Sequence, residues 1–146
     1  MTLLEINDKI TPDRDKTNII HHFTVPQGIK KLTVAYKYSP KRVEDKELAK
    51  KAVASGMKKY GVTFANPERF MPVNNLVTLS FDENGRYRGA CHRQQNEQTV
   101  VISEKRSTPG IINGSVEPGD WDVMLNIHYI GCAVQYSILI TGEAES

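Results

Sequence analysis

The sequence contains little cysteine, little net charge and no long apolar run. Its two cysteines, Cys91 and Cys132, lie far apart and form no CxxC pair, so we expect two free thiols rather than a disulfide. Nineteen basic and seventeen acidic residues leave a net charge of +2, too small to indicate a nucleic-acid partner. No stretch resembles a signal peptide or a membrane span, so we expect a cytoplasmic protein without a membrane partner.

Signatures of common catalytic and cofactor-binding sites are also missing. The chain has no GxSxG elbow, no glycine-rich phosphate loop before a helix, and no HExxH or HxH pair. The stretch "DENG" (82–85) begins like a calcium loop but lacks the later ligands, which favours a four-residue hairpin loop with Gly85 at positive φ. We therefore expect no catalytic residue, no cofactor and no enzymatic activity.

The four histidines are the residues from which a metal site could be built. His21 and His22 are neighbours on a predicted strand, so their side chains point to opposite faces and cannot share an ion. The weak candidates are His22 and His128, if the fold brings His128 beside His21 or His22. A metal-dependent jelly-roll enzyme is the least favoured functional hypothesis, because it needs several histidines and a carboxylate to converge.

Most of the sequence alternates with a period of two. In "KKLTVAYKYS" (30–39), for example, Leu32, Val34, Tyr36 and Tyr38 face one way, as in a half-buried strand. The pattern predicts one all-β domain over 1–146, an antiparallel β-sandwich or jelly roll of about eight strands. The predicted strands are 3–10, 18–25, 30–39, 75–82, 86–92, 97–103, 120–130 and 133–141.

One segment, 43–61, has a helical period instead. It carries acids at its start, lysines at its end and Gly61 where a C-cap glycine belongs, so we expect an amphipathic helix within an insertion spanning 41–73. Residues 62–73 are predicted to form a packed loop. Between Lys41 and Tyr60 there are seven basic and three acidic residues. A solvated helix that covers one end of the sandwich is favoured over a site for an anionic partner.

Turn residues separate the predicted strands. Pro26-Gln-Gly28 should turn the chain into the Leu32 strand, and Pro-Gly pairs at 109–110 and 118–119 precede Trp121. Trp121 is the only tryptophan and leads an alternating apolar series, which predicts a core residue. The 108–121 stretch is therefore expected to turn the chain into a strand.

Three stretches, 21–38, 74–90 and 108–130, together resemble the N-terminal β-sandwich that precedes the catalytic domain in CehA/McbA-type metallohydrolases of the PHP superfamily. The resemblance consists of an F-x-V-P-x-G turn, an N-L strand with an R-G hairpin, and a TPG…G…PG-x-W series. In those enzymes the metal-binding histidines lie in the following PHP domain, so only structural roles are implied here. The matching residues are Phe23, Pro26, Gly28, Asn75, Arg88, Gly89, Thr108, Pro109, Gly110, Gly119 and Trp121.

The resemblance favours a non-catalytic accessory or binding module, with a separate metallohydrolase as its partner. The alternative is a carbohydrate or small anionic ligand-binding domain that uses aromatic residues and the basic helix. Its candidate binding residues are Tyr60, Phe64, Phe70 and Tyr87. An open sandwich also has unpaired strand edges, so a homodimer is a further hypothesis.

Overall fold

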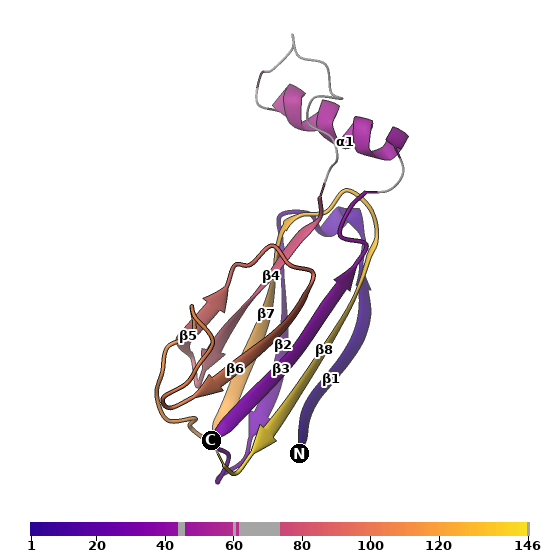
Figure 1. Ribbon diagram of the computed structural model, residues 1–146. Coiled ribbons are helices and arrows are strands. Elements are labelled where there is room, and N and C mark those ends of the chain that lie inside the picture. Colours follow the sequence, from indigo (N-terminus) through magenta and orange to yellow (C-terminus); the bar gives the residue numbers. More distant parts are fainter. Residues whose placement is uncertain (44–45, 60, 62–73, 146) are drawn as a thin grey trace.

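The computed structural model describes residues 1–43, 46–59, 61 and 74–145, which form a β-sandwich (Figure 1). The predicted all-β class is confirmed, and the predicted strand ends are correct to within two residues. The short helix η1 (Pro12–Arg14) follows the first strand, and α1 (Lys46–Lys59) separates the third and fourth. The strands are β1 (Thr2–Ile10), β2 (Asn18–Val25), β3 (Lys31–Ser39), β4 (Leu76–Glu83), β5 (Arg86–Cys91), β6 (Glu97–Ser103), β7 (Gly119–Tyr129) and β8 (Val134–Glu143).

The strands form two four-stranded antiparallel sheets with a jelly-roll order. Sheet A has the order β1-β8-β3-β6, and sheet B has the order β2-β7-β4-β5. Every connection except the β4–β5 hairpin therefore crosses from one sheet to the other. Such crossing is the mark of paired Greek keys and makes the apolar face of each strand pack against the opposite sheet.

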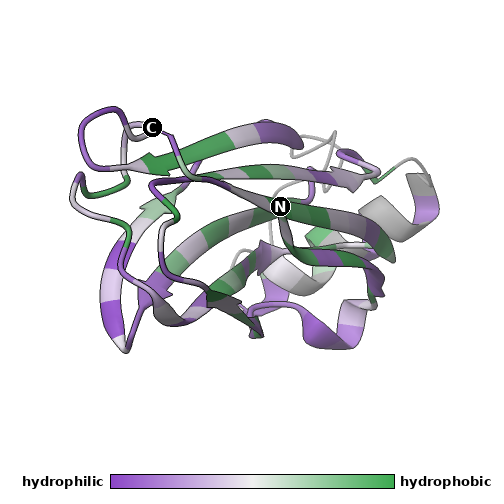
Figure 2. Ribbon diagram, turned by 90° about the horizontal axis from the view of Figure 1, so that it is seen from below, coloured by the Kyte–Doolittle hydropathy of each residue, from purple (hydrophilic) through white to green (hydrophobic). Residues whose placement is uncertain are grey.

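The core lies between the sheets and follows the predicted alternation. Leu32, Val34, Tyr36 and Tyr38 of β3 are all buried, and Figure 2 shows the alternation as coloured bands along the strands. The buried hydroxyls of Tyr36 and Tyr38 donate to the backbone carbonyls of Val77 in β4 and of Asn75 just before it, so both hydroxyls have a hydrogen-bond partner in the core. Trp121 is fully buried as predicted.

The predicted turns are present, with one correction. The β4–β5 loop contains two residues, not four: Asn84 and Gly85 have φ values of 49° and 80°, while Asp82 and Glu83 belong to β4. Two successive positive φ values match the twist of a tight hairpin, which explains the shorter loop. Gly28 also has positive φ, and its turn carries the chain from β2 in sheet B to β3 in sheet A.

The buried guanidinium of Arg88 holds the loop between β6 and β7, residues 104–118. It donates to the carbonyl oxygens of Ile112 (2.8 Å), Ser115 (2.9 Å) and Gly114 (2.5 Å). Its Nη1 also donates to both carboxylate oxygens of Glu83 at 2.9 Å. Five donors in a fixed fork suit this role, since each of the three loop carbonyls receives a charge-assisted hydrogen bond.

The 104–118 loop joins the edges of both sheets. The Thr108 hydroxyl accepts from the backbone N–H of Val101 in β6 (2.8 Å), and the backbone N–H of Ala90 in β5 donates to Gly110 (3.1 Å). Gly89 and Gly110 allow the close crossing, because a Cβ on Gly89 would lie 2.6 Å from the Gly110 carbonyl oxygen. The loop therefore closes one side of the sandwich and covers two edge strands.

The insertion is anchored through Asn75, which is fully buried. Its Nδ2 donates to the Pro40 carbonyl oxygen (2.8 Å), and its Oδ1 accepts from the backbone N–H of Gly131 (2.9 Å). The described helix α1 is shorter than the predicted 43–61 and projects beyond one end of the sandwich (Figure 1). Gly61 has a φ of 73° after its end, as predicted. Residues 62–73, the predicted packed loop, lie outside the described residues.

Among the described helices, none combines the length and the apolar character needed to cross a bilayer.

Replacing Arg88 should strongly destabilise the fold. Arg88→Ala leaves three loop carbonyls and the largely buried Glu83 carboxylate without their partner. We expect the free energy of unfolding to fall by about 3–5 kcal/mol, as when one member of a buried ion pair is removed. Urea denaturation measures it. The exposed Arg86→Ala on the same strand should change it by less than about 0.5 kcal/mol. Equal effects of the two variants would contradict this role.

Replacing Asn75 should loosen the base of the insertion. Asn75→Ala leaves the Gly131 N–H and the Pro40 carbonyl without these bonds, and we expect a loss of about 1–3 kcal/mol in unfolding free energy. The adjacent, exposed Asn74→Ala is the control. Hydrogen exchange should quicken at Gly131 in the Asn75 variant alone; unchanged protection there would argue against the anchor.

Candidate functional site

The two weak metal candidates, His22 and His128, do not come together. The register of β2 on β7 pairs His22 with Asp122, six residues from His128, which is about 20 Å along a strand. His22 Nδ1 instead bonds the carboxylate of Asp122 on an exposed face. Within the described part of the chain, no three histidine, cysteine or acidic residues form a metal-binding group.

His21 lies on the inner face of β2, away from His22. Its Nε2 is 2.8 Å from the hydroxyl oxygen of Tyr136, and the β1 residue opposite Tyr136 is Asp8. Burial lowers the pKa of His21 more than Asp8 raises it, and His22 lowers it further. Burial and the Asp8 charge raise the pKa of Tyr136 to about 12. His21 and Tyr136 therefore form a largely neutral pair that joins β2 of sheet B to β8 of sheet A.

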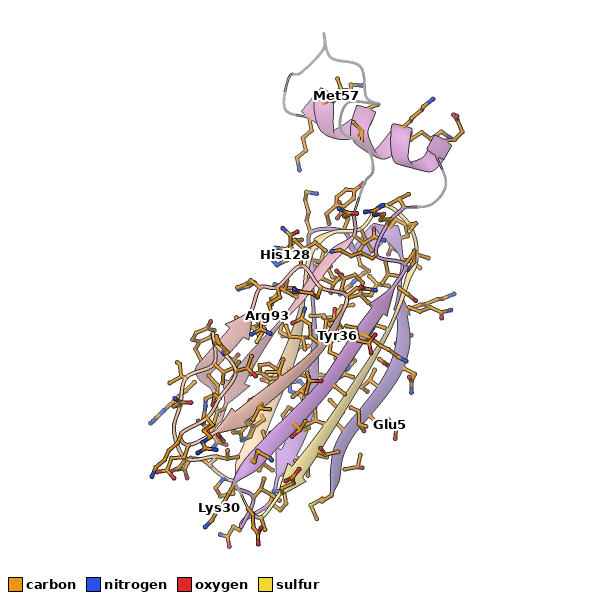
Figure 3. The ribbon with its side chains drawn as sticks, viewed as in Figure 1. Glu5, Lys30, Tyr36, Met57, Arg93 and His128 are labelled. Carbon is orange, nitrogen blue, oxygen red and sulfur yellow. The ribbon has the colours of Figure 1, made fainter. Side chains whose placement is uncertain are left out.

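His128 instead meets His92 through the buried hydroxyl of Thr78. Thr78 Oγ1 lies 2.8 Å from Nε2 of His128 and 3.1 Å from Nδ1 of His92. The two rings are edge to face, with centroids 5.6 Å apart. Burial lowers the pKa of His128, and the neighbouring His92 lowers it further. Figure 3 places His128 toward the end of the sandwich that carries α1.

The histidine pair borders a hollow of about 380 Å³ on the outer face of sheet B. One polar atom there is unmatched: the buried Asn126 Nδ2 has no hydrogen-bond partner among the described residues. The side chains at the hollow supply mainly hydrogen-bond donors, and none of the described ones is acidic. They belong to Lys16, Asn18, His92, Asn126, Ile127 and His128.

A larger hollow of about 670 Å³ lies on the outer face of sheet A. One row of cross-strand neighbours runs through it, from Asn7 of β1 through Ser137 and Lys37 to Glu97 of β6. Lys9, Ser39 and Gln135 extend it toward the end of the strands. A second hollow of about 370 Å³ shares this row and continues over Ala35 and Leu139. We call the two together the sheet A trough.

The side chains of this row are exposed, except that of Ser137, which is half-buried. Lys37 and Glu97 are direct cross-strand neighbours, yet they form no ion pair with each other or with another described residue. The tyrosines of these strands, Tyr36, Tyr38 and Tyr136, face the core instead. The trough therefore offers hydroxyl, amide and charged groups without an aromatic platform.

The predicted aromatic ligand face is not assembled by the described residues. Tyr87 is exposed (62%) on the edge strand β5 of sheet B, opposite Asp82 and away from the trough. Tyr60, Phe64 and Phe70 lie outside the described residues.

Most of the polar residues and glycines that carry the family resemblance have the structural roles described above. They are Gly28, Asn75, Arg88, Gly89, Thr108 and Gly110. Phe23 packs against Trp121 with ring centroids 6.1 Å apart, and the Trp121 Nε1–H donates to the Glu117 carbonyl (2.9 Å). Pro26, Pro109 and Gly119 lie in or beside the turns that end or begin strands.

Sequence reasoning missed both the trough and the His92–Thr78–His128 cluster. His92 and His128 are too far apart in sequence for any motif, and they meet only because β4 lies between β5 and β7 in sheet B. The trough residues occupy the polar positions of four alternating strands, a pattern shared by any solvated sheet face. One feature of the sequence could have pointed to the trough: the outer positions of β8 carry few charged residues.

Comparisons with models of protein families and with curated proteins give no match for this chain. Among solved structures, a protein from Sulfurospirillum deleyianum aligns with 94% of this chain and 98% of its own, at 11% identity and a TM-score of 0.34. A likeness of that size carries no argument about fold or function. The resemblance to CehA/McbA-type enzymes accordingly stays a prediction.

The coupling within the histidine pair can be measured directly. His92→Gln removes the positive charge that opposes protonation of His128, so the pKa of His128 should rise while burial keeps it below its ordinary value. NMR titration of the imidazole carbons would record this. His22→Gln, on the same sheet but far along it, should leave the His128 titration unchanged. An unchanged titration in the His92 variant would show that the two rings are not coupled.

Proposed function

We propose that this chain is a non-catalytic binding module whose ligand lies in the sheet A trough. The observation that supports this most is the row Asn7, Ser137, Lys37 and Glu97, which four strands contribute and whose side chains have no partner among the described residues. A hollow of about 670 Å³ is within the range of roughly 300–1,000 Å³ that small-molecule sites occupy.

The mixture of groups favours a carbohydrate. Asn7, Gln135 and the two serines can each donate and accept, while Lys37 only donates and ionised Glu97 only accepts. A ligand with hydroxyl groups on successive carbons matches such interleaved donors and acceptors. An anion would favour donors alone, and an apolar peptide would need more than the single exposed Leu139. The sugar ring's C–H face would contact Ala35 and Leu139.

The trough chemistry favours binding over catalysis. Its hydroxyls, Ser39 and Ser137, have no histidine among the described lining residues to act as a base. The carboxylates of Glu5 and Asp8 lie on β1, three strand spacings or roughly 14 Å from Glu97 on β6, which is farther apart than the carboxylate pairs of glycosidases. Nucleophilic and glycosidic chemistry both need such pairs. The proposed site therefore differs from the aromatic site of the alternative sequence hypothesis, although a carbohydrate is the ligand in both.

A glycan microarray, followed by calorimetry on the strongest oligosaccharide, tests this function. The double variant Lys37→Ala/Glu97→Ala should weaken affinity at least about tenfold, because it removes two hydrogen bonds to charged groups. The control is Glu104→Ala/Lys105→Ala, which removes the same charges from an exposed loop. Absence of any array signal, or equal loss in both double variants, would contradict a carbohydrate site in the trough.

The accessory role beside a metallohydrolase rests on the sequence resemblance alone. It predicts that affinity-purified chain recovers a hydrolase with a PHP domain, identified by mass spectrometry. Recovery of no hydrolase would count against this partner and leave the trough proposal unaffected. A homodimer, if it forms, would use the edge strands β1 and β2, because the 104–118 loop covers the other two edges.

A further inference from the structure

We infer that the hollow bordered by His92, Asn126 and His128 is a binding site for a small oxyanion group, such as a sulfate or phosphate. It lies on the outer face of sheet B, so it is separate from the trough and its test does not depend on the carbohydrate proposal.

The unmatched amide of Asn126 is the first observation that supports an acceptor-bearing ligand. Its Nδ2 is buried without a hydrogen-bond partner, while its Oδ1 has only the long contact of 3.5 Å with Ser80 Oγ. A buried N–H without a partner is destabilising, and a ligand oxygen in the hollow would supply the missing acceptor. The neighbouring Asn18 amide and Lys16 ammonium add further donors.

The Thr78 hydroxyl fixes how the two imidazoles present their other nitrogens. It holds a single proton, so in the neutral pair it donates to one ring and accepts an N–H from the other. The ring that accepts must then carry its own N–H on the nitrogen that faces away from Thr78. The other ring offers a lone pair there. The neutral pair therefore has one outward donor.

A single added proton changes this pair into an anion site. It binds the outward lone pair, and both rings then donate outward, with one positive charge and both bonds to Thr78 intact. A second proton would break one of those bonds and place two cations together. Oxyanion binding should therefore take up about one proton, and binding and protonation should strengthen each other.

The other charged groups near the hollow are two basic side chains and one carboxylate. Lys16, from the turn before β2, pairs with the Asp15 carboxylate at 3.1 Å, and Asp15 Oδ1 also accepts from the Ile130 N–H at 2.9 Å. That hydrogen bond holds one Asp15 oxygen at the backbone. Arg93 follows His92 in the chain. Histidine is the side chain that ordinarily changes charge between pH 6 and 8, so the pair should govern the pH dependence.

The experiment is an NMR titration of the ¹⁵N-labelled full chain with sodium sulfate at constant ionic strength. Sulfate stays a dianion between pH 6 and 8, so any pH dependence belongs to the protein. We expect saturable shifts of the Asn126 side-chain amide and the His92 and His128 rings, with affinity at pH 6.0 at least about threefold higher than at pH 8.0. Glycerol 3-phosphate, titrated in parallel, distinguishes a free oxyanion from one carried by a larger molecule.

Two sets of variants complete the test. Asn126→Asp replaces the donor with a like charge and should weaken sulfate binding at least about tenfold. His92→Gln/His128→Gln should remove the pH dependence of sulfate binding. His22→Gln should change neither the sulfate affinity nor its pH dependence. Circular dichroism establishes that each variant is folded. The inference is overturned if neither anion gives saturable shifts at Asn126, or if shifts saturate only at the lysines of α1. The wild-type shifts alone decide it should a variant fail to fold.

Discussion

The hydrogen bonds of the buried Arg88 guanidinium are the interaction on which both outer faces of the sandwich depend. Its bonds to three carbonyls and to Glu83 hold the 104–118 loop against β5. The same loop bonds β6 through Thr108. One polar cluster therefore holds both β6, which carries Glu97 of the trough, and the end of β5, which His92 follows. The Arg88 guanidinium also lies over the Trp121 ring.

The two outer faces carry different chemistry although one core supports both. The face of sheet A interleaves donors and acceptors and has balanced charges, which suits a ligand of many hydroxyl groups. The hollow on sheet B gathers donors around an unmatched amide and two coupled imidazoles. Apart from Ile127, the side chains named at the two sites lie outside the hydrophobic core, so ligand contacts can vary with little cost to stability. The proposed binding role would account for the polar groups that have no partner among the described residues.

Much of the fold could be predicted from the sequence, because alternation and turn residues act locally. The β3 and β7 patterns identified core faces correctly, including Trp121, and Gly61, Gly85 and Gly110 mark backbone positions with positive φ. The hairpin loop was predicted too long because strand pairing continues to Glu83 once Asn84 adopts positive φ. The sites could not be predicted, since each joins residues from strands that are distant in sequence. His22 and His128 show the difficulty: they lie on neighbouring strands, yet the register keeps them apart.

Mapping an oligosaccharide onto the chain by NMR would test the central claim most directly. With the two outer faces separated by the core, the backbone amides of each sheet report on their own side. A carbohydrate site in the trough should give saturable shifts at Asn7, Lys37, Glu97, Gln135 and Ser137, with the outer positions of β2 and β7 unchanged. Shifts confined to sheet B or to α1, or none with any oligosaccharide of a broad panel, would contradict a carbohydrate-binding trough.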